Sequence, residues 1–386
     1  MRRISRILII IALMLCTAAA YCGSMQQRTL IAREGNGYLE RVGETQLVLH
    51  VKGTPREMGY QHGVLLKDHI RQMVETLHSK IADMSDVPDI GTANMMFDTV
   101  WRKQLPYMPQ RFIDEMKGLA EGCGLPFNEI RRANTIPEFF HCSGFAVFGG
   151  ATKDGNLYHG RVLDYGISLG YQDHAVVTIA EPEGYKPFVT VGYSGFIGSV
   201  TGMNLHGVSF GEMGGAGQGK WDGAPMSFLM RRGMEEAETL DEAKSIFRDT
   251  KRTCEYFYVI SDSKIPSAVG VAAVPEKIDF VGPNEAMAPL DTPIKDAVVL
   301  SAGDRYRLLT KRVQDMWGKL DAESCIELMR RPVSMKDNLH CALMSPKTRE
   351  LWVANASHTG EPASEQPYTY LDIRKLMKQM PKKSGK

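Results

Sequence analysis

Apolar and polar residues divide this chain into a largely helical first third and a strand-rich body. Residues 28–52 follow a β-rich pattern. Thr54 before Pro55 predicts a helix start there, because proline suits the first helical position. From this point to about residue 133, apolar residues recur at helical spacing with few β-branched runs. We therefore expect a short sheet followed by several helices.

After residue 141 the pattern changes to short apolar strands separated by glycine-rich turns. Strands are predicted at 142–149, 156–163, 175–180, 186–192, 197–202, 207–211, 255–261, 268–273 and 297–301, and in a hairpin at 339–344 and 350–354. Helices are predicted at 227–248 (with a break at 239–242), 306–317 and 323–329. Antiparallel hairpins with helices on their faces indicate an α+β fold rather than a doubly wound sheet.

The most informative hairpin begins at Cys142, which opens an apolar strand. A turn at Lys153–Asn156 sends the chain back, and the returning strand carries Arg161 and Asp164. With the turn centred on residues 154 and 155, Cys142 lies opposite residue 167. Arg161 then shares a face of the sheet with Cys142, whereas Asp164 does so only if a bulge or the strand end redirects it.

These residue types can support nucleophilic catalysis. A thiolate is the attacking species, and a nearby guanidinium lowers the pKa of a thiol. If the chain cuts itself between His141 and Cys142, the new α-amine, with an ordinary pKa of about 7.7–8.0, can act as the base for its own thiol. Asp164 would orient that amine and Arg161 would fix Asp164, while an oxyanion donor is also required. The competing interpretation is a buried core cysteine beside a structural ion pair.

Composition excludes several classes of protein. The 386 residues carry a formal net charge of +1 without a basic stripe, which argues against nucleic-acid binding. The seven cysteines include no Cys-x-x-Cys pair, so neither a zinc site nor any other metal or cofactor is expected. Residues 211–219 are rich in glycine but lack a phosphate-loop Lys-Ser/Thr ending, and we interpret them as a mobile loop.

The first twenty residues have the pattern of a secretory signal peptide. Arg2, Arg3 and Arg6 precede an apolar run from Ile7 to Leu15, and residues 18–20 are alanines. This run is short for a membrane span. The pattern predicts removal of residues 1–20 and export to the periplasm or the extracellular space, with a retained anchor as the alternative.

Several motifs together resemble the autoproteolytic acyltransferase and hydrolase family typified by acyl-coenzyme A:6-aminopenicillanic-acid acyltransferase, within the N-terminal nucleophile (Ntn) hydrolases. Acid ceramidase and bile-salt hydrolase are more distant members of this group. The motifs are the run 53–63 with its Gly-Tyr-Gln-His-Gly element, Met116–Gly122, the Cys142 strand, His159–Tyr165 with its Gly-Arg-x-x-Asp element, and Gly202–Ser209.

The resemblance implies an αββα sandwich of two antiparallel sheets between helical layers. It implies that self-cleavage leaves an α-chain (21–141, after removal of the signal peptide) and a β-chain (142–386) that remain associated. By the same resemblance Cys142 is the nucleophile, and Arg161 and Asp164 are further catalytic residues. Asn204 is implied to be a catalytic oxyanion residue or a loop-organising residue, and Tyr165 and Arg305 are implied to bind substrate. Relatives often carry an asparagine in the oxyanion hole after a later strand, where this chain has Ser301-Ala302.

The function predicted from these features is an exported cysteine amidohydrolase or acyltransferase. It would act on a small-molecule linear acyl amide through a thioester on Cys142. One alternative is an uncut, inactive secreted binding protein on the same fold, which the missing asparagine favours. Another is a papain-like hydrolase that pairs Cys142 with a distant histidine such as His340.

Overall fold

The computed structural model describes residues 26–82, 89–135, 142–216, 219–287 and 290–381. The predicted signal peptide (1–20) and His141 lie outside these residues. Within the part of the chain that is described, no helix is long and apolar enough to cross a bilayer.

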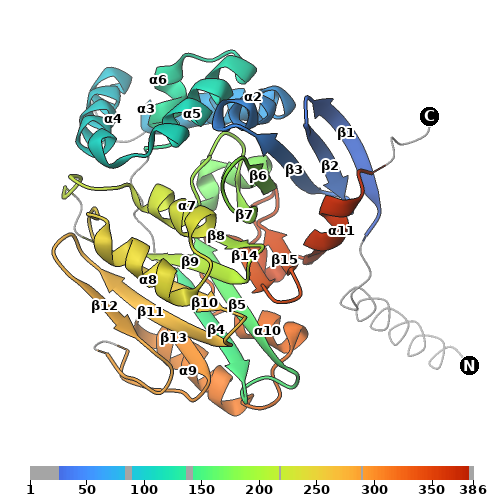
Figure 1. The fold of residues 1–386 in the computed structure, drawn as a ribbon, viewed down its shortest axis with the longest axis vertical. Helices are drawn as coiled ribbons and strands as arrows, with labels where there is room; N and C mark the ends of the chain where they lie inside the picture. The colour runs from blue at the N-terminus through green and yellow to red at the C-terminus, as the bar shows by residue number, and fades with distance from the viewer. Residues whose placement is uncertain (1–25, 83–88, 136–141, 217–218, 288–289, 382–386) are drawn as a thin grey trace, which may run out of the picture.

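Among its described residues, the first third contains three strands and then five α-helices, as the pattern predicts. These are β1 (Arg28–Glu34), β2 (Gly37–Val42), β3 (Gln46–Gly53), α2 (Pro55–Leu65), α3 (Lys67–Ala82), α4 (Ile90–Gln104), α5 (Gln110–Cys123) and α6 (Phe127–Ala133). The predicted helix start is confirmed: the Thr54 hydroxyl accepts from the Glu57 N–H, and the Glu57 carboxylate accepts from the Thr54 N–H. Figure 1 shows these helices gathered at one end of the molecule.

Glycines in two of the family-like motifs allow α2 and α5 to pack unusually closely. A Cβ atom on Gly59 would lie 1.9 Å from the Glu115 carbonyl oxygen, and one on Gly118 would lie 2.1 Å from that of Arg56. Any side chain at these positions would force the helices apart. The Gly-Tyr-Gln-His-Gly element therefore has a packing reason that is independent of catalysis.

The rest of the chain alternates strands with pairs of helices. Its strands are β4 (Ser143–Gly149), β5 (Gly155–Asp164), β6 (Ala175–Pro182), β7 (Phe188–Tyr193), β8 (Thr201–Asn204), β9 (Val208–Gly214), β10 (Tyr256–Asp262), β11 (Ser267–Ala273), β12 (Ile278–Val281), β13 (Ala297–Leu300), β14 (Asn338–Ser345), β15 (Glu350–Asn355) and β16 (Thr369–Asp372). Its α-helices are α7 (Met226–Glu236), α8 (Leu240–Asp249), α9 (Gly303–Asp315), α10 (Ala322–Leu328) and α11 (Ile373–Lys378).

The strands form two sheets, in the orders β1-β2-β3-β6-β7-β8-β9-β10-β11-β12 and β13-β4-β5-β14-β15-β16. Neighbouring strands are antiparallel except for β3 and β6, which pair in parallel. This pair departs from the prediction of purely antiparallel sheets. Through it, the strands before residue 141 join the same sheet as strands that follow Cys142.

The two sheets face each other, with helices outside both. One apolar core lies between the larger sheet and helices α2, α5, α7 and α8, and includes Phe112, Phe228 and Phe247. A second core joins β4, β5 and β13 to α9 and α10, and includes Leu309 and Ile326. Residues of both sheets, such as Val177 and Ala342, fill the space between them. The predicted αββα sandwich is confirmed (Figure 1).

Candidate active site

The hairpin of β4 and β5 determines what lies beside Cys142. Ser143 pairs with Val162 and Gly144 with Arg161, so continuing the register by one residue sets Cys142 opposite Leu163. The predicted partner, residue 167, is wrong because the connection is longer: Gly149 pairs with Gly155, and the register shifts just before it. The predicted and observed partners of Cys142, residues 167 and 163, differ by an even number of residues. Because side chains alternate between the two faces of a strand, Arg161 still lies on the same face of the sheet as Cys142.

On that face Arg161 connects the thiol to a buried carboxylate. The Arg161 Nη2 atom lies 3.4 Å from Cys142 Sγ and 3.3 Å from Glu212 Oε2. The Arg161 Nε–H also donates to the Glu212 carbonyl oxygen at 3.0 Å. All three residues are buried between the sheets, with exposed fractions of 4% for Cys142, 0% for Arg161 and 1% for Glu212. The thiol therefore has a fixed positive charge as its immediate neighbour.

Burial dominates the protonation of this group. It raises the pKa of the Cys142 thiol to about 11, although the Arg161 charge and the Gly214 N–H both favour the thiolate. Burial also raises the pKa of Glu212 to about 7, against the opposing effect of Arg161. In the uncut chain the thiol is therefore protonated at neutral pH, and it needs a nearby base to become a nucleophile.

Two polar atoms of this cluster have no hydrogen-bond partner among the described residues. They are Arg161 Nη1 and Glu212 Oε1. A buried polar atom without a partner costs about 1–3 kcal/mol, so such atoms are rare away from functional sites. Their position beside a cysteine marks this cluster as a place where another molecule can supply the missing contacts.

Asp164 lies in a second cluster. It does not form the predicted ion pair with Arg161 in the described part of the chain. Its carboxylate pairs with Arg305 and accepts the Met335 N–H at 2.9 Å. Arg305 also donates to the Ser143 hydroxyl at 2.7 Å. Arg305, and not Arg161 as predicted, therefore holds Asp164 in place. Alternate residues of β5 point to opposite faces of the sheet, so Asp164 lies on the face opposite to Arg161.

The two clusters flank the Cys142 backbone from opposite faces. Asp164 follows Leu163, the residue across from Cys142, and Ser143 follows Cys142 itself. The Ser143 hydroxyl also contacts Ser301 Oγ at 2.6 Å, so the segment expected to carry an asparagine does lie beside the site. Burial raises the pKa of Asp164 to about 6, although Arg305 favours its ionised form.

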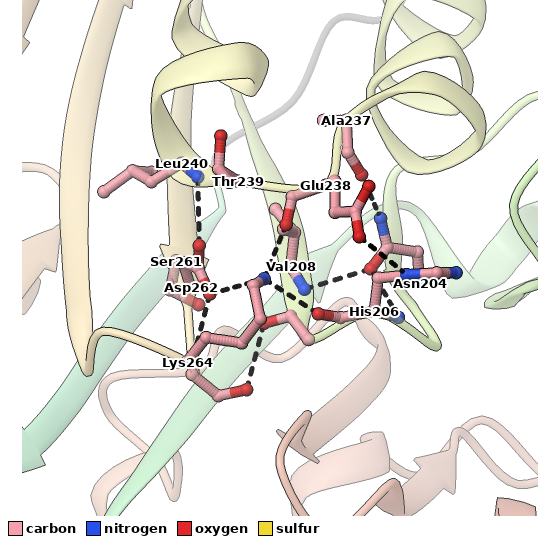
Figure 2. Close-up of polar contacts among 12 residues, drawn as sticks. Asn204, His206, Val208, Ala237, Glu238, Thr239, Leu240, Ser261, Asp262 and Lys264 are labelled. Atoms are coloured by element: carbon pink, nitrogen blue, oxygen red, sulfur yellow. Dashed lines mark hydrogen bonds and ion pairs between the residues drawn. The ribbon is translucent and has the colours of Figure 1, made fainter.

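None of the hydrogen bonds of Asn204 connects it to either of these clusters. Its amide donates to the Met234 and Ala237 carbonyl oxygens, and its side-chain oxygen accepts from the His206 and Val208 N–H groups. Figure 2 shows it beside His206, Val208 and Ala237, at the turn between β8 and β9. Because all its hydrogen-bonding capacity holds this turn against the end of α7, the structure gives it a loop-organising role and no oxyanion contact.

The histidine of the papain-like alternative is also occupied. His340 contacts the Tyr193 hydroxyl through Nδ1 at 2.9 Å and the Thr201 hydroxyl through Nε2 at 3.0 Å. Neither ring nitrogen bonds to Cys142, and burial holds the pKa of His340 well below its usual range. His340 therefore has no base role at the thiol in this arrangement.

An apolar cavity of about 120 Å³ lies beside the Cys142 face. Leu163, which is opposite Cys142, and Glu212, which shares Arg161 with it, both line this cavity. Tyr165 also lines it, with its ring stacked on that of Tyr171 at 5.5 Å. Residues of α3 and α6 complete the wall, so the cavity lies between segments that precede and follow residue 141.

Glu212 is the residue that sequence reasoning missed. We expected residues 211–219 to form a mobile loop, but Val208–Gly214 is the buried strand β9. The available signal was an isolated acidic residue within an apolar and glycine-rich run, flanked by Phe210 and Met213. A carboxylate in a buried strand has to be paired or functional.

Comparisons with known proteins agree with the resemblance seen in the motifs. Residues 151–285 match the model of the acyl-coenzyme A:6-aminopenicillanic acid acyltransferase family, a region that includes Arg161, Asp164 and Glu212 but not Cys142. Protein dcd1A of Dictyostelium discoideum is 25% identical over 376 residues, covering 86% of this chain and 84% of that protein. The predicted similarity to this family is therefore confirmed.

Two further similar proteins are an acid ceramidase and an acid amidase. Rat acid ceramidase is 26% identical over 229 residues, covering 51% of this chain and 56% of that protein. The Caenorhabditis elegans ortholog of N-acylethanolamine-hydrolyzing acid amidase is 18% identical in structure-based comparison, with a TM-score of 0.45, covering 53% of this chain and 93% of that one. By sequence, the chain is thus similar to an acyltransferase family and to an acid ceramidase.

Proposed function

Since the chain is a relative of the acyl-coenzyme A:6-aminopenicillanic acid acyltransferase family, we propose that it is an exported cysteine hydrolase or acyltransferase that matures by cleaving its own His141–Cys142 bond. The observation that carries the proposal is the 3.4 Å approach of Arg161 Nη2 to Cys142 Sγ beside an apolar cavity. Export rests on the predicted signal peptide at residues 1–20.

Maturation supplies the base that the buried thiol lacks. Cleavage releases the α-amine of Cys142, which then belongs to the same residue as the nucleophile. Asp164, which lies next to the residue opposite Cys142, is suited to bind this amine from one side of the sheet. Arg161 stabilises the thiolate from the other side, and Arg305 orients Asp164.

The reaction divides into two steps. The amine takes the thiol proton, and the sulfur attacks the carbonyl carbon of the substrate amide to form a C–S bond. The C–N bond then breaks, and the leaving amine departs with the proton that the α-ammonium returns to it. Water, or a second amine, then attacks the thioester carbonyl to form a C–O or C–N bond, and the α-amine takes up its proton. The C–S bond breaks, which releases the carboxylic acid or a new amide, and the α-ammonium returns the proton to the sulfur to restore the thiol.

The oxyanion of each tetrahedral intermediate needs hydrogen-bond donors near Cys142. The Gly214 N–H already interacts with the thiol, so we assign it as one donor. Ala302 cannot supply a side-chain donor as an asparagine would. Tyr165 is assigned to the acyl-binding wall, and Arg305 acts through Asp164 and Ser143 rather than through a direct substrate contact.

A trapping experiment tests this proposal. Purified wild-type protein is mixed with an N-acyl amide and quenched in acid, and the mass of the 142–386 chain is measured. A mass increase equal to the acyl group, absent from a Cys142→Ser variant at the same pH, supports a thioester on Cys142. A protein that stays uncut and forms no adduct with any acyl amide supports the alternative of an inactive binding protein.

A further inference from the structure

The cavity beside Cys142 is almost entirely apolar, and it has a distinct inner end. Val200, Tyr193 and Ile70 are buried residues of its wall, whereas Met73 and Leu77 of α3 are partly exposed. Glu212 contributes the only acidic or basic side chain among the described residues of the lining. A group that fills this space from Glu212 towards α3 must therefore be uncharged and hydrophobic over most of its length.

The Glu212 oxygen that has no hydrogen-bond partner among the described residues determines which end of a ligand lies near Cys142. Glu212 Oε1 is buried and has no hydrogen-bond partner in the described part of the chain, so a polar atom of a ligand can satisfy it. The same carboxyl group contacts Arg161, which contacts Cys142 Sγ. The polar end of the ligand therefore lies at the nucleophile, and its apolar end extends towards α3.

The cavity volume limits how much of the apolar end is enclosed. A hydrophobic protein cavity of about 150 Å³ holds one benzene molecule, which has six carbons. The cavity here measures about 120 Å³, so it encloses a group of about that size or slightly smaller. Carbons beyond it would pass the partly exposed residues of α3 and gain less from burial.

We propose that this site is built for a compact, uncharged acyl group, either a straight chain of about six carbons or a single phenyl ring, rather than for the buried length of a long fatty-acyl chain. The proposal rests on the proposed function, because it assumes that the acyl part of the amide occupies the cavity. It goes beyond that function by naming the class of acyl group.

A series of N-acyl anilides from acetyl to palmitoyl, with phenylacetyl added, tests the proposal. For the self-cleaved wild-type protein we expect kcat/KM to rise up to about fourfold per methylene through hexanoyl. From octanoyl to palmitoyl we expect less than a twofold total change, and phenylacetyl should match hexanoyl. A rise that continues to palmitoyl, or a maximum at acetyl, overturns the proposal.

Two substitutions at Val74 of α3 should change the acyl-chain length at which kcat/KM stops rising, one shortening it and the other lengthening it. Val74→Leu reduces the cavity and should end the rise one or two carbons earlier, whereas Val74→Ala should extend it by a similar amount. Gln72→Leu and Gln72→Ala are matched controls, because Gln72 is exposed on the same helix. A break that stays at the same chain length in both Val74 variants contradicts the proposal.

Binding of 1-alkanols separates this proposal from the proposed function. Butanol to decanol are neutral, and their affinity for wild-type protein can be measured by calorimetry without any turnover. If no acyl amide is hydrolysed but alkanol affinity stops rising at about hexanol, the proposed function fails and the size assignment stands. Alkanol affinity that keeps rising to decanol overturns the size assignment, whether or not the protein is an enzyme.

Discussion

Two buried arginines in this protein differ in how completely their side-chain nitrogens are hydrogen-bonded. Arg231 on α7 has each of its side-chain nitrogens bonded: it pairs with Glu115 and Glu235 and also donates to the Ile197 carbonyl oxygen. Arg161 on β5 shares one nitrogen between a thiol and a carboxylate, and leaves another without a partner among the described residues.

The difference separates a structural ion pair from a site prepared for chemistry. Arg231 joins α7 to α5, so it ties the chain before residue 141 to the chain after it. Four of its five guanidinium N–H groups are hydrogen-bonded, and none of its nitrogens is left without a partner. Arg161 and Glu212 keep unused hydrogen-bonding capacity beside a cysteine and a cavity, which is where perturbed pKa values point to function. Burial of charge alone does not distinguish the two.

The largest expected effect is that of removing the sulfur. Cys142→Ala should remain a single chain across residues 141 and 142, and should lose acyl-amide hydrolysis by at least about a thousandfold. Gel electrophoresis and a kinetic assay check both results. Cys325→Ala is a suitable control, because Cys325 is also a buried free cysteine in the same core. Retained hydrolysis in Cys142→Ala would remove the nucleophile assignment.

Replacing each arginine in turn tests the comparison directly. Arg231→Met leaves Glu115 buried without its ion-pair partner, while Glu235 keeps only Arg111, and should cost about 3–5 kcal/mol in the free energy of unfolding. Arg161→Met should cost less near pH 6, because Glu212, with a pKa of about 7, can become neutral by binding a proton. It should nevertheless lower kcat/KM by about a hundredfold or more.

Urea unfolding and steady-state kinetics measure these two quantities. The comparison fails if Arg161→Met is as destabilising as Arg231→Met at pH 6. It also fails if Arg161→Met keeps both self-cleavage and full activity.

The pH dependence of stability should reveal the burial of Glu212. Its pKa is raised from 4.5 to about 7 in the folded protein, so the folded state holds this proton more tightly than the unfolded chain does. Its contribution to stability is complete below pH 4.5 and is lost as the pH rises through 7, a change of about 3 kcal/mol. Glu212→Gln should lack this loss, as urea unfolding at pH 4.5 and pH 8 would show. Parallel pH curves for variant and wild type would contradict the assignment.

A smaller effect is expected at Asn204. Asn204→Ala removes four hydrogen bonds at the turn between β8 and β9, and should lower the free energy of unfolding by about 1–3 kcal/mol. Because this turn is held away from Cys142 by those contacts, kcat should stay within about twofold of wild type where both are folded. A loss of kcat with unchanged stability would restore Asn204 as an oxyanion donor.

Local sequence signals predicted the α+β class and the hairpin, whereas the αββα sandwich was implied by the resemblance of the motifs to a known family. The strand that opens at Cys142, the turn at Lys153–Asn156 and the alternation along β5 all lie within a short span. Because side chains alternate along a strand, the sequence placed Cys142 and Arg161 on one face of the sheet. This prediction is correct although the predicted pairing register was wrong. The N-terminal cap at Thr54 was predictable for the same reason.

The partners of each charged residue could not be predicted in this way. The contact of Arg161 with Glu212 joins strands of different sheets, and that of Asp164 with Arg305 joins residues far apart in the chain. Such pairings depend on how the sheets stack, which no short-range pattern encodes. Asn204 shows the converse: its motif was visible, but only its contacts with α7 revealed a structural role.

Determining the N-terminus of each chain in the purified, active protein tests the central claim most directly. Our account predicts two chains that remain together, one of which begins at Cys142 and contains residues 142–386. The Arg231–Glu115 pair and the β3–β6 pairing should keep the other chain bound to it. An active protein in which no chain begins at Cys142 would contradict the account.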